Sequence, residues 1–131
     1  MATIIVGVVC ILNLPALEAK PVIVNVDNFV RAEIAAQFDR MLTFVNGEVN
    51  TLFHFREPIP LDKQSVIRMN RDTFYSAAIV DISKGATMTI PETNGRYVSA
   101  MIVNEDHYVN KVYDTAGTYD LTMDEFHTPY V

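Results

Sequence analysis

Several features that mark particular protein classes are scarce or missing in this 131-residue sequence. It has a single cysteine, Cys10, so no disulfide can form within the chain. No apolar run reaches the ~18–20 residues needed to cross a bilayer, so we expect no stable membrane span. Lys and Arg total 10 against 16 Asp and Glu, and the resulting net charge of −6 argues against a nucleic-acid partner.

Most motifs that carry known chemistry are also missing. There is no Gly-rich phosphate loop, no dinucleotide fingerprint and no G-x-S-x-G elbow. The histidines, His54, His107 and His127, are too dispersed for a recognised metal motif. We therefore predict no metal and no cofactor. The alternative is a metal site that combines these histidines in three dimensions with Glu105 or Asp106.

What is present is typical of one globular domain. Half of the residues are hydrophobic and 20% are charged, and six Tyr and seven Phe supply material for a core.

The first nineteen residues differ from the rest. Residues 4–14 are almost wholly apolar, Pro15 follows, and Ala19 is a small residue at which cleavage would leave Lys20 first. This is the outline of a secretory signal, although no Lys or Arg precedes the apolar stretch and Leu17 stands where a smaller residue is usual. We predict that residues 1–19 are a signal peptide or apolar leader, which implies a secreted or periplasmic protein. A buried strand or a truncated start is the alternative.

One amphipathic α-helix is predicted between Asn25 and Asn46. Asn25 or Asp27 can cap its start, and Asn46-Gly47 is a strong stop. The apolar residues of the predicted core-facing stripe recur every three or four positions, at Val26, Val30, Ile34, Phe38, Met41 and Val45.

Strands are predicted after this helix. Residues 48–63 include Pro58 and Pro60 and indicate an extended loop. Asn94-Gly95 is a strong hairpin signal. Strands spaced by ~8–12 residues without helices between them favour a mainly β, antiparallel β-sandwich. The predicted strands are residues 66–67, 73–82, 87–90, 97–103, 108–113 and 118–121.

The last residues, HTPYV at 127–131, look like the start of another strand. We therefore expect the chain to be a fragment of a longer protein, or a shortened relative of one. A sandwich with an open edge strand tends to pair with another chain, which predicts a homo-oligomer or a missing C-terminal domain.

The first polar cluster is residues 68–76, RMNRDTFYS. Arg68 and Arg71 each offer a rigid fork of donors that suits carboxylate or phosphate, so the cluster predicts a site for a small anionic ligand. The structural alternative is a network in which one of these arginines pairs with Asp72, Glu57 or Glu105 and ties a loop to the sheet.

The second polar cluster is residues 104–108, NEDHY. His107 can act as a general acid or base when Glu105 or Asp106 orients it, and Tyr108 or Tyr75 can donate a hydrogen bond. The structural alternative is a charged turn with a hydrogen-bonded histidine.

Three segments together resemble the DUF1254 family: VDNFVRAE at 26–33, REPIPLDKQSVIRMNRDTFYSAAIVDI at 56–82, and VNEDHY at 103–108. The resemblance covers residues 22–131. It implies an exported bacterial protein, with relatives in large viruses, whose first domain is an immunoglobulin-like β-sandwich preceded by a helix. A helical segment and a jelly-roll domain of the DUF1214 type usually follow, and this sequence stops inside the first domain.

The family has no settled activity, so the resemblance implies a fold and the location of a site but no reaction. It suggests that the two polar clusters line a common pocket. The candidate catalytic residues are His107, Glu105, Asp106 and Tyr108. The candidate ligand-binding residues are Arg68, Asn70, Arg71, Asp72, Tyr75, Ser76 and Asn104.

Two functions remain open. The first is a binding or assembly module with a polar pocket for a small anionic ligand. The second is part of a hydrolase-like or lyase-like enzyme, with His107 as acid/base and Arg68 and Arg71 as anion holders.

Overall fold

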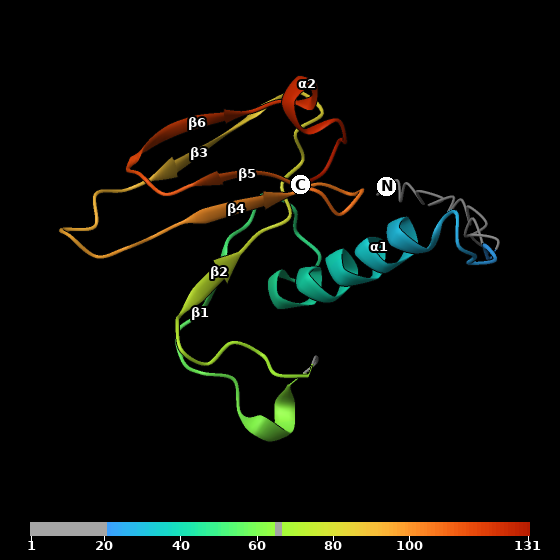
Figure 1. The fold of residues 1–131 in the computed structure, drawn as a ribbon, viewed down its shortest axis with the longest axis horizontal. Coiled ribbons are helices and arrows are strands. Elements are labelled where there is room, and N and C mark those ends of the chain that lie inside the picture. Colours follow the sequence, from blue (N-terminus) through green and yellow to red (C-terminus); the bar gives the residue numbers. More distant parts are fainter. Residues whose placement is uncertain (1–20, 65–66) are drawn as a thin grey trace, which may run out of the picture.

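The computed structural model describes residues 21–64 and 67–131. The leader predicted for residues 1–19, Cys10 and Val66 lie outside these described residues. The described chain is mainly β, with one long helix before the strands, as the sequence predicts. Its six strands form three separate two-stranded antiparallel sheets (Figure 1). Among the described residues, no helix is both long and apolar enough to cross a bilayer.

The elements follow one another in this order: α1 (Phe29–Leu42), a 3-10 turn (Thr43–Val45), β1 (Phe53–Phe55), a 3-10 turn (Leu61–Lys63), β2 (Tyr75–Ala77), β3 (Ala86–Ile90), β4 (Ala100–Val103), β5 (Val109–Tyr113), β6 (Gly117–Leu121) and α2 (Met123–Phe126).

The stop predicted for helix α1 is confirmed. Asn46 and Gly47 both have positive φ, 54° and 83°, and the Gly47 N–H donates to the Leu42 carbonyl over 2.8 Å. Glycine adopts this left-handed conformation at no steric cost, and asparagine tolerates it, so the pair turns the chain out of the helix.

The start of α1 differs from the prediction. Neither Asn25 nor Asp27 caps the helix. Its N-cap is Asn28, whose side chain makes no capping bond, and the Asn25 side chain instead accepts from the Asp27 N–H in a preceding turn. Of the predicted apolar stripe, only Ile34 is buried. Val26 lies before the first helical turn and is 90% exposed, and Val30 is 46% exposed.

The strand pairing also differs from the prediction at one turn. Asn94 and Gly95 form the expected tight turn, with φ of 53° and 83°. The strands on either side of it do not pair with each other, because β3 pairs with β6 and β4 pairs with β5. Strand β1 lies within the predicted loop of residues 48–63. The predicted strand at 66–67 is wrong in its described residue, because Ile67 lies in an exposed turn.

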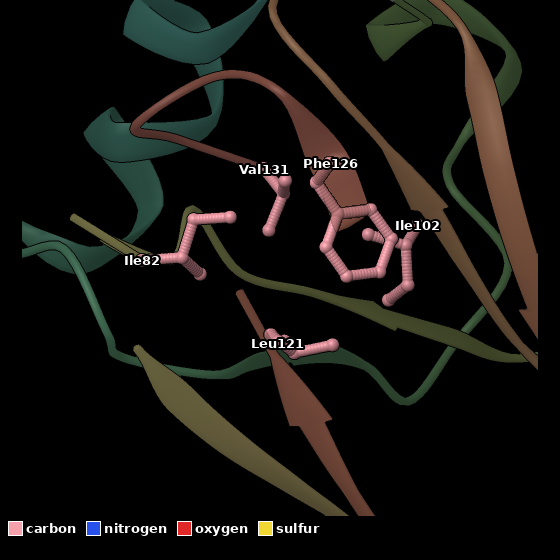
Figure 2. Packing of buried hydrophobic residues seen from close by; sticks show 5 residues of the cluster. All are labelled: Ile82, Ile102, Leu121, Phe126 and Val131. Atoms are coloured by element: carbon pink, nitrogen blue, oxygen red, sulfur yellow. The ribbon is translucent and has the colours of Figure 1, made fainter. Parts of the chain in front are cut away.

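The main core lies between the β3–β6 and β4–β5 sheets (Figure 2). Phe126 from α2 and Ile82 are fully buried there. Residues 129–131 run antiparallel to residues 80–82, and backbone bonds join Val80 to Val131 in both directions, at 2.8 and 3.1 Å. The strand-like start predicted at the C-terminal end therefore pairs with this chain's own backbone. The buried residues of this core are Ile82, Ile102, Leu121, Phe126 and Val131.

The β1–β2 sheet projects away from this core (Figure 1). One of its faces is held by stacked rings. The ring centroids of Phe53 and of Phe44, in the turn after α1, lie 5.1 Å apart. Those of Phe55 and Tyr75 lie 4.7 Å apart across the sheet. Alternate residues of a strand point to opposite faces, so His54 and Ser76 lie on the other, exposed face.

Candidate functional site

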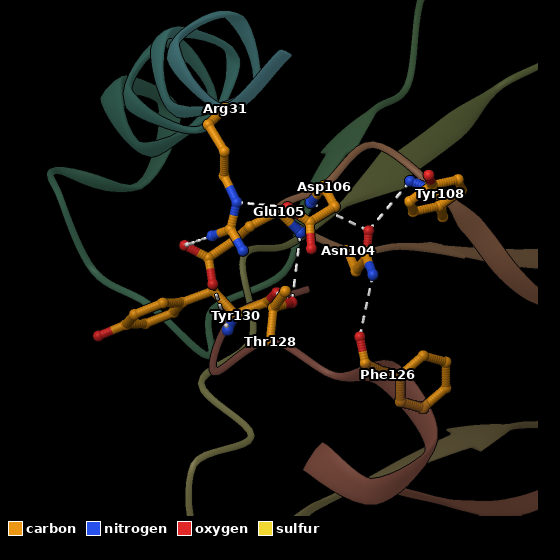
Figure 3. A network of polar contacts seen from close by, with 8 residues as sticks. All are labelled: Arg31, Asn104, Glu105, Asp106, Tyr108, Phe126, Thr128 and Tyr130. Carbon is orange, nitrogen blue, oxygen red and sulfur yellow. Dashed lines mark hydrogen bonds and ion pairs between the residues drawn. The ribbon is translucent and has the colours of Figure 1, made fainter. Parts of the chain in front are cut away.

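The second polar cluster forms the turn between β4 and β5, and Asn104 fixes its shape. Asn104 is only 2% exposed. Its side-chain oxygen accepts from the backbone N–H groups of Asp106 and Tyr108, each over 3.0 Å. Its amide nitrogen donates to the Phe126 carbonyl over 3.0 Å (Figure 3). One asparagine thus closes the turn and attaches it to helix α2.

Glu105 and Thr128 connect the same turn to the C-terminal segment. The Glu105 N–H donates to the hydroxyl of Thr128, which is fully buried and itself donates to the Tyr130 carbonyl. The Glu105 carboxylate accepts from the Tyr130 N–H over 3.3 Å. The turn therefore donates a hydrogen bond to the C-terminal segment and accepts one from it, so each segment holds the other in place.

Arg31 attaches helix α1 to this network (Figure 3). Its Nε donates to the Asp106 carboxylate over 2.5 Å, and its Nη1 lies 3.6 Å from the Glu105 carboxylate. Arg31 was not among the predicted site residues, although it lies in VDNFVRAE, one of the three segments that carry the resemblance. Its place in that segment is the sequence signal that could have identified Arg31.

This arrangement does not favour the acid/base role expected of His107. In the described part of the chain, no hydrogen bond or ion pair joins the His107 side chain to Glu105 or Asp106, whose carboxylates interact with Arg31. His107 has a φ of 64° at the tip of the turn and is exposed, as is Tyr108. The carboxylates therefore hold a helix and do not orient an imidazole.

A groove of about 270 Å³ lies beside the Arg31 network, between helix α1 and the body of the domain. Its lining is mainly apolar, with Glu105 and Arg31 among its polar members. None of the first cluster's residues lines it. The residues at this groove are Arg31, Ile34, Ala35, Phe38, Asp39, Leu42, Val49, Ile79, Glu105 and Tyr130.

The first polar cluster is exposed and bonded mainly to itself. Asn70 donates to the Thr73 hydroxyl over 2.5 Å and accepts from the Asp72 N–H over 2.9 Å. The Arg71 guanidinium donates to the Ile59 carbonyl over 3.0 Å, so it joins two neighbouring loops. Arg68 has a φ of 60°. None of the ion pairs weighed for these arginines, with Asp72, Glu57 or Glu105, forms within the described ranges.

A second hollow, of about 330 Å³, lies on the exposed face of the β1–β2 sheet. His54 and Ser76 are direct register partners there, and His54 Nδ1 lies 2.6 Å from Ser76 Oγ. Arg56, two residues after His54, and Phe74, two residues before Ser76, lie just beyond the paired strand residues and line the same hollow. Tyr75 and Ser76 were expected to bind ligand, whereas His54 and Arg56 were not selected as part of this site.

The two polar clusters do not share a pocket in the described structure. Tyr75 and Ser76 line the hollow on β1–β2, and Glu105 lines the groove beside α1. No group of three or more potential metal ligands gathers among the residues that the structure describes.

Comparison with known families bears on both clusters. The model of one family, described as "Protein of unknown function (DUF1254)", matches residues 49–121, more than half of the chain. The chain belongs to the DUF1254 family. No curated protein and no solved structure matches it.

The DUF1254 match contains all six strands and both polar clusters. Helix α1 and the C-terminal segment lie outside it. The Arg31 network therefore joins residues within the matched range, Glu105 and Asp106, to residues on either side of it.

Proposed function

We propose that this DUF1254 domain is a binding module that takes a small anionic ligand in the hollow on the β1–β2 sheet. One observation carries the proposal: His54, Arg56 and Ser76, which carry an imidazole, a guanidinium and a hydroxyl, are exposed and line the same hollow. The sequence predicts the same class of ligand. The proposed site keeps Ser76 from the predicted cluster and adds His54 and Arg56 from β1 and the residue after it.

The chemistry of these groups suits an oxyanion. A guanidinium presents several N–H donors in a planar fork that matches a carboxylate or phosphate, and a hydroxyl adds one more donor. Phe74 is 70% exposed beside them, so an apolar part of the ligand can lie against its ring. Phe55 and Tyr75 also line the hollow, and their rings pack against each other across the two strands.

Titration with inorganic phosphate and with benzoate, followed by NMR amide shifts, tests this proposal. We expect shifts centred on residues 54–56 and 74–76, and about tenfold weaker binding in Arg56→Gln, because the strongest charged donor is lost. Arg96→Gln is the matched control, since Arg96 is also exposed but lies on the Asn94-Gly95 turn. Equal binding by the two variants, or shifts elsewhere, would contradict the proposal.

A second candidate function is assembly with another copy of this chain. Met101 and Val112 are cross-strand partners on the outer face of the β4–β5 sheet, and they are 61% and 53% exposed. Val109, also 53% exposed, lies on the same sheet. Apolar side chains gathered on one sheet face, next to strands with free edges, favour pairing with a second such sheet.

Light scattering over a range of protein concentrations tests self-association. We expect a dimer that dissociates in Met101→Glu, with Thr87→Glu on β3 as the exposed-strand control. A monomer at every concentration would contradict this second function.

We also propose that the protein is exported and that its strands form an immunoglobulin-like sandwich. Export rests on the apolar pattern of residues 1–19 and on the resemblance to exported proteins. An immunoglobulin-like sandwich rests on the core shared by β3–β6 and β4–β5, where Leu121 and Ile102 from the two sheets belong to one buried cluster.

A further inference from the structure

The hollow on β1–β2 contains a pair of groups with a chemical capacity beyond binding. Ser76 Oγ and His54 Nδ1 are 2.6 Å apart, within the distance at which an imidazole can remove a hydroxyl proton. Both side chains are exposed, so a substrate can reach them. In the described residues, His107 and His127 have no comparable serine or threonine partner.

Two features of the fold keep this pair in register. His54 and Ser76 face each other in the antiparallel ladder, between the pairs Phe53–Ala77 and Phe55–Tyr75. The rings of Phe55 on β1 and Tyr75 on β2 also pack against each other, with centroids 4.7 Å apart, and join the same two strands. The serine and histidine are thus placed by backbone pairing, which fixes their separation better than two flexible loops would.

We propose that Ser76 and His54 form a nucleophile–base pair that hydrolyses an ester carrying an anionic group. This inference rests on the proposed function for the placement of the substrate's anionic group. Arg56 lines the same hollow, where its donors can hold that group or stabilise the negative charge that develops on the attacked carbonyl oxygen.

The reaction balances with water as its only co-reactant. Ser76 Oγ attacks the ester carbonyl carbon while its proton moves to His54 Nδ1. The bond between that carbon and the ester oxygen breaks, and the leaving alcohol takes the proton from His54. Water then attacks the acylated serine, gives one proton through His54 to Ser76 Oγ, and releases the acid. One ester and one water become one acid and one alcohol.

The test is covalent labelling of the native protein with a fluorophosphonate probe, which reacts with activated serines. Peptide mass spectrometry then locates the label. We expect labelling at Ser76 that is lost in Ser76→Ala and slowed on the order of 100-fold in His54→Asn. Ser99→Ala and His127→Asn are the matched controls, because both residues are exposed and lie outside the hollow.

Labelling of Ser76 no faster than that of Ser99 would overturn the inference. Phosphate binding by the same native preparation separates the two proposals. If phosphate binds at residues 54–56 and Ser76 is not labelled, the nucleophile–base pair is refuted and the anion site stands. If neither is observed, both are refuted.

Discussion

The two polar clusters of this domain differ in where their hydrogen bonds go. In residues 104–108, the side chain of Asn104 bonds to the backbone of its own turn and to buried helix α2. In residues 68–76, the side chain of Asn70 bonds to the neighbouring Asp72 and Thr73 on the surface. Both segments are rich in polar residues, yet one is bonded into the buried part of the domain and the other is mostly exposed.

The comparison separates two roles that residue types alone do not distinguish. A buried polar group must find partners, because its loss from water otherwise costs free energy. The side-chain oxygen and nitrogen of Asn104 both have partners within the domain, which favours a structural role. The exposed groups near β1–β2 have no such requirement, which leaves His54, Arg56 and Ser76 available to a ligand. Substitutions in the two regions should therefore have very different effects on stability.

The largest expected effect is that of Asn104→Ala. The variant removes three hydrogen bonds and leaves the Phe126 carbonyl without its donor in a buried position. We expect the free energy of unfolding to fall by about 3 kcal/mol in urea denaturation. The matched variant in the other cluster is Asn70→Ala, for which we expect a change within about 0.5 kcal/mol. A similar fall in the free energy of unfolding in both variants would contradict the different roles of the two clusters.

Thr128→Val should have the next largest effect. The replacement keeps the volume of a fully buried side chain but removes the hydroxyl that links the Glu105 N–H to the Tyr130 carbonyl. We expect a loss of about 1–2 kcal/mol, measured by thermal and urea unfolding. Thr118→Val is the control, because its hydroxyl bonds to Thr89 on an exposed strand face. An unchanged stability in Thr128→Val would show that this link contributes nothing.

Arg31→Gln should have a smaller effect that depends on salt. The Arg31 side chain is 50% exposed, and its partner Asp106 is 40% exposed, so solvent screens the pair. We expect a loss of about 0.5–1 kcal/mol at low salt, which largely disappears at about 1 M NaCl. Arg40→Gln, which breaks only an ion pair to Glu33 within α1, is the control. A loss of stability that does not depend on salt would mean that Arg31 stabilises the domain by packing and not by its charge.

The smallest effect concerns Asp81, which lies between β2 and β3 in the chain and pairs with Tyr130 in an isolated β-bridge. The Ser83 hydroxyl, then the Ser83 backbone N–H and the charge of Lys84, lower the pKa of Asp81. A lowered folded-state pKa contributes stability above the ordinary pKa of aspartate, and this contribution is lost as pH falls through the lowered value. An NMR titration of Ser83→Ala should move the pKa of Asp81 back toward its ordinary value, whereas Ser99→Ala should not.

The sequence correctly predicted the elements that depend on residues close together in the chain. The left-handed stop at Asn46-Gly47 and the turn at Asn94-Gly95 follow from backbone sterics of the residues themselves. Strands 86–90, 100–103, 109–113 and 117–121 lie close to their predicted ranges because the predicted segments are rich in β-branched and aromatic residues. Strand β1 was missed because three residues between a helix stop and two prolines leave no periodic signal.

The sequence determined by itself the mainly β class, the leading helix, its stop, and the presence of two polar clusters. Only the tertiary structure decided which partners the side chains of these clusters contact. Asn104 became structural because Phe126 was buried against it, and Glu105 turned toward Arg31 rather than His107 because helix α1 lies beside that turn. His54 and Ser76 are 22 residues apart in the chain, and only strand pairing places them in contact. Long-range pairing of this kind depends on the geometry of the whole sheet, which no local spacing encodes.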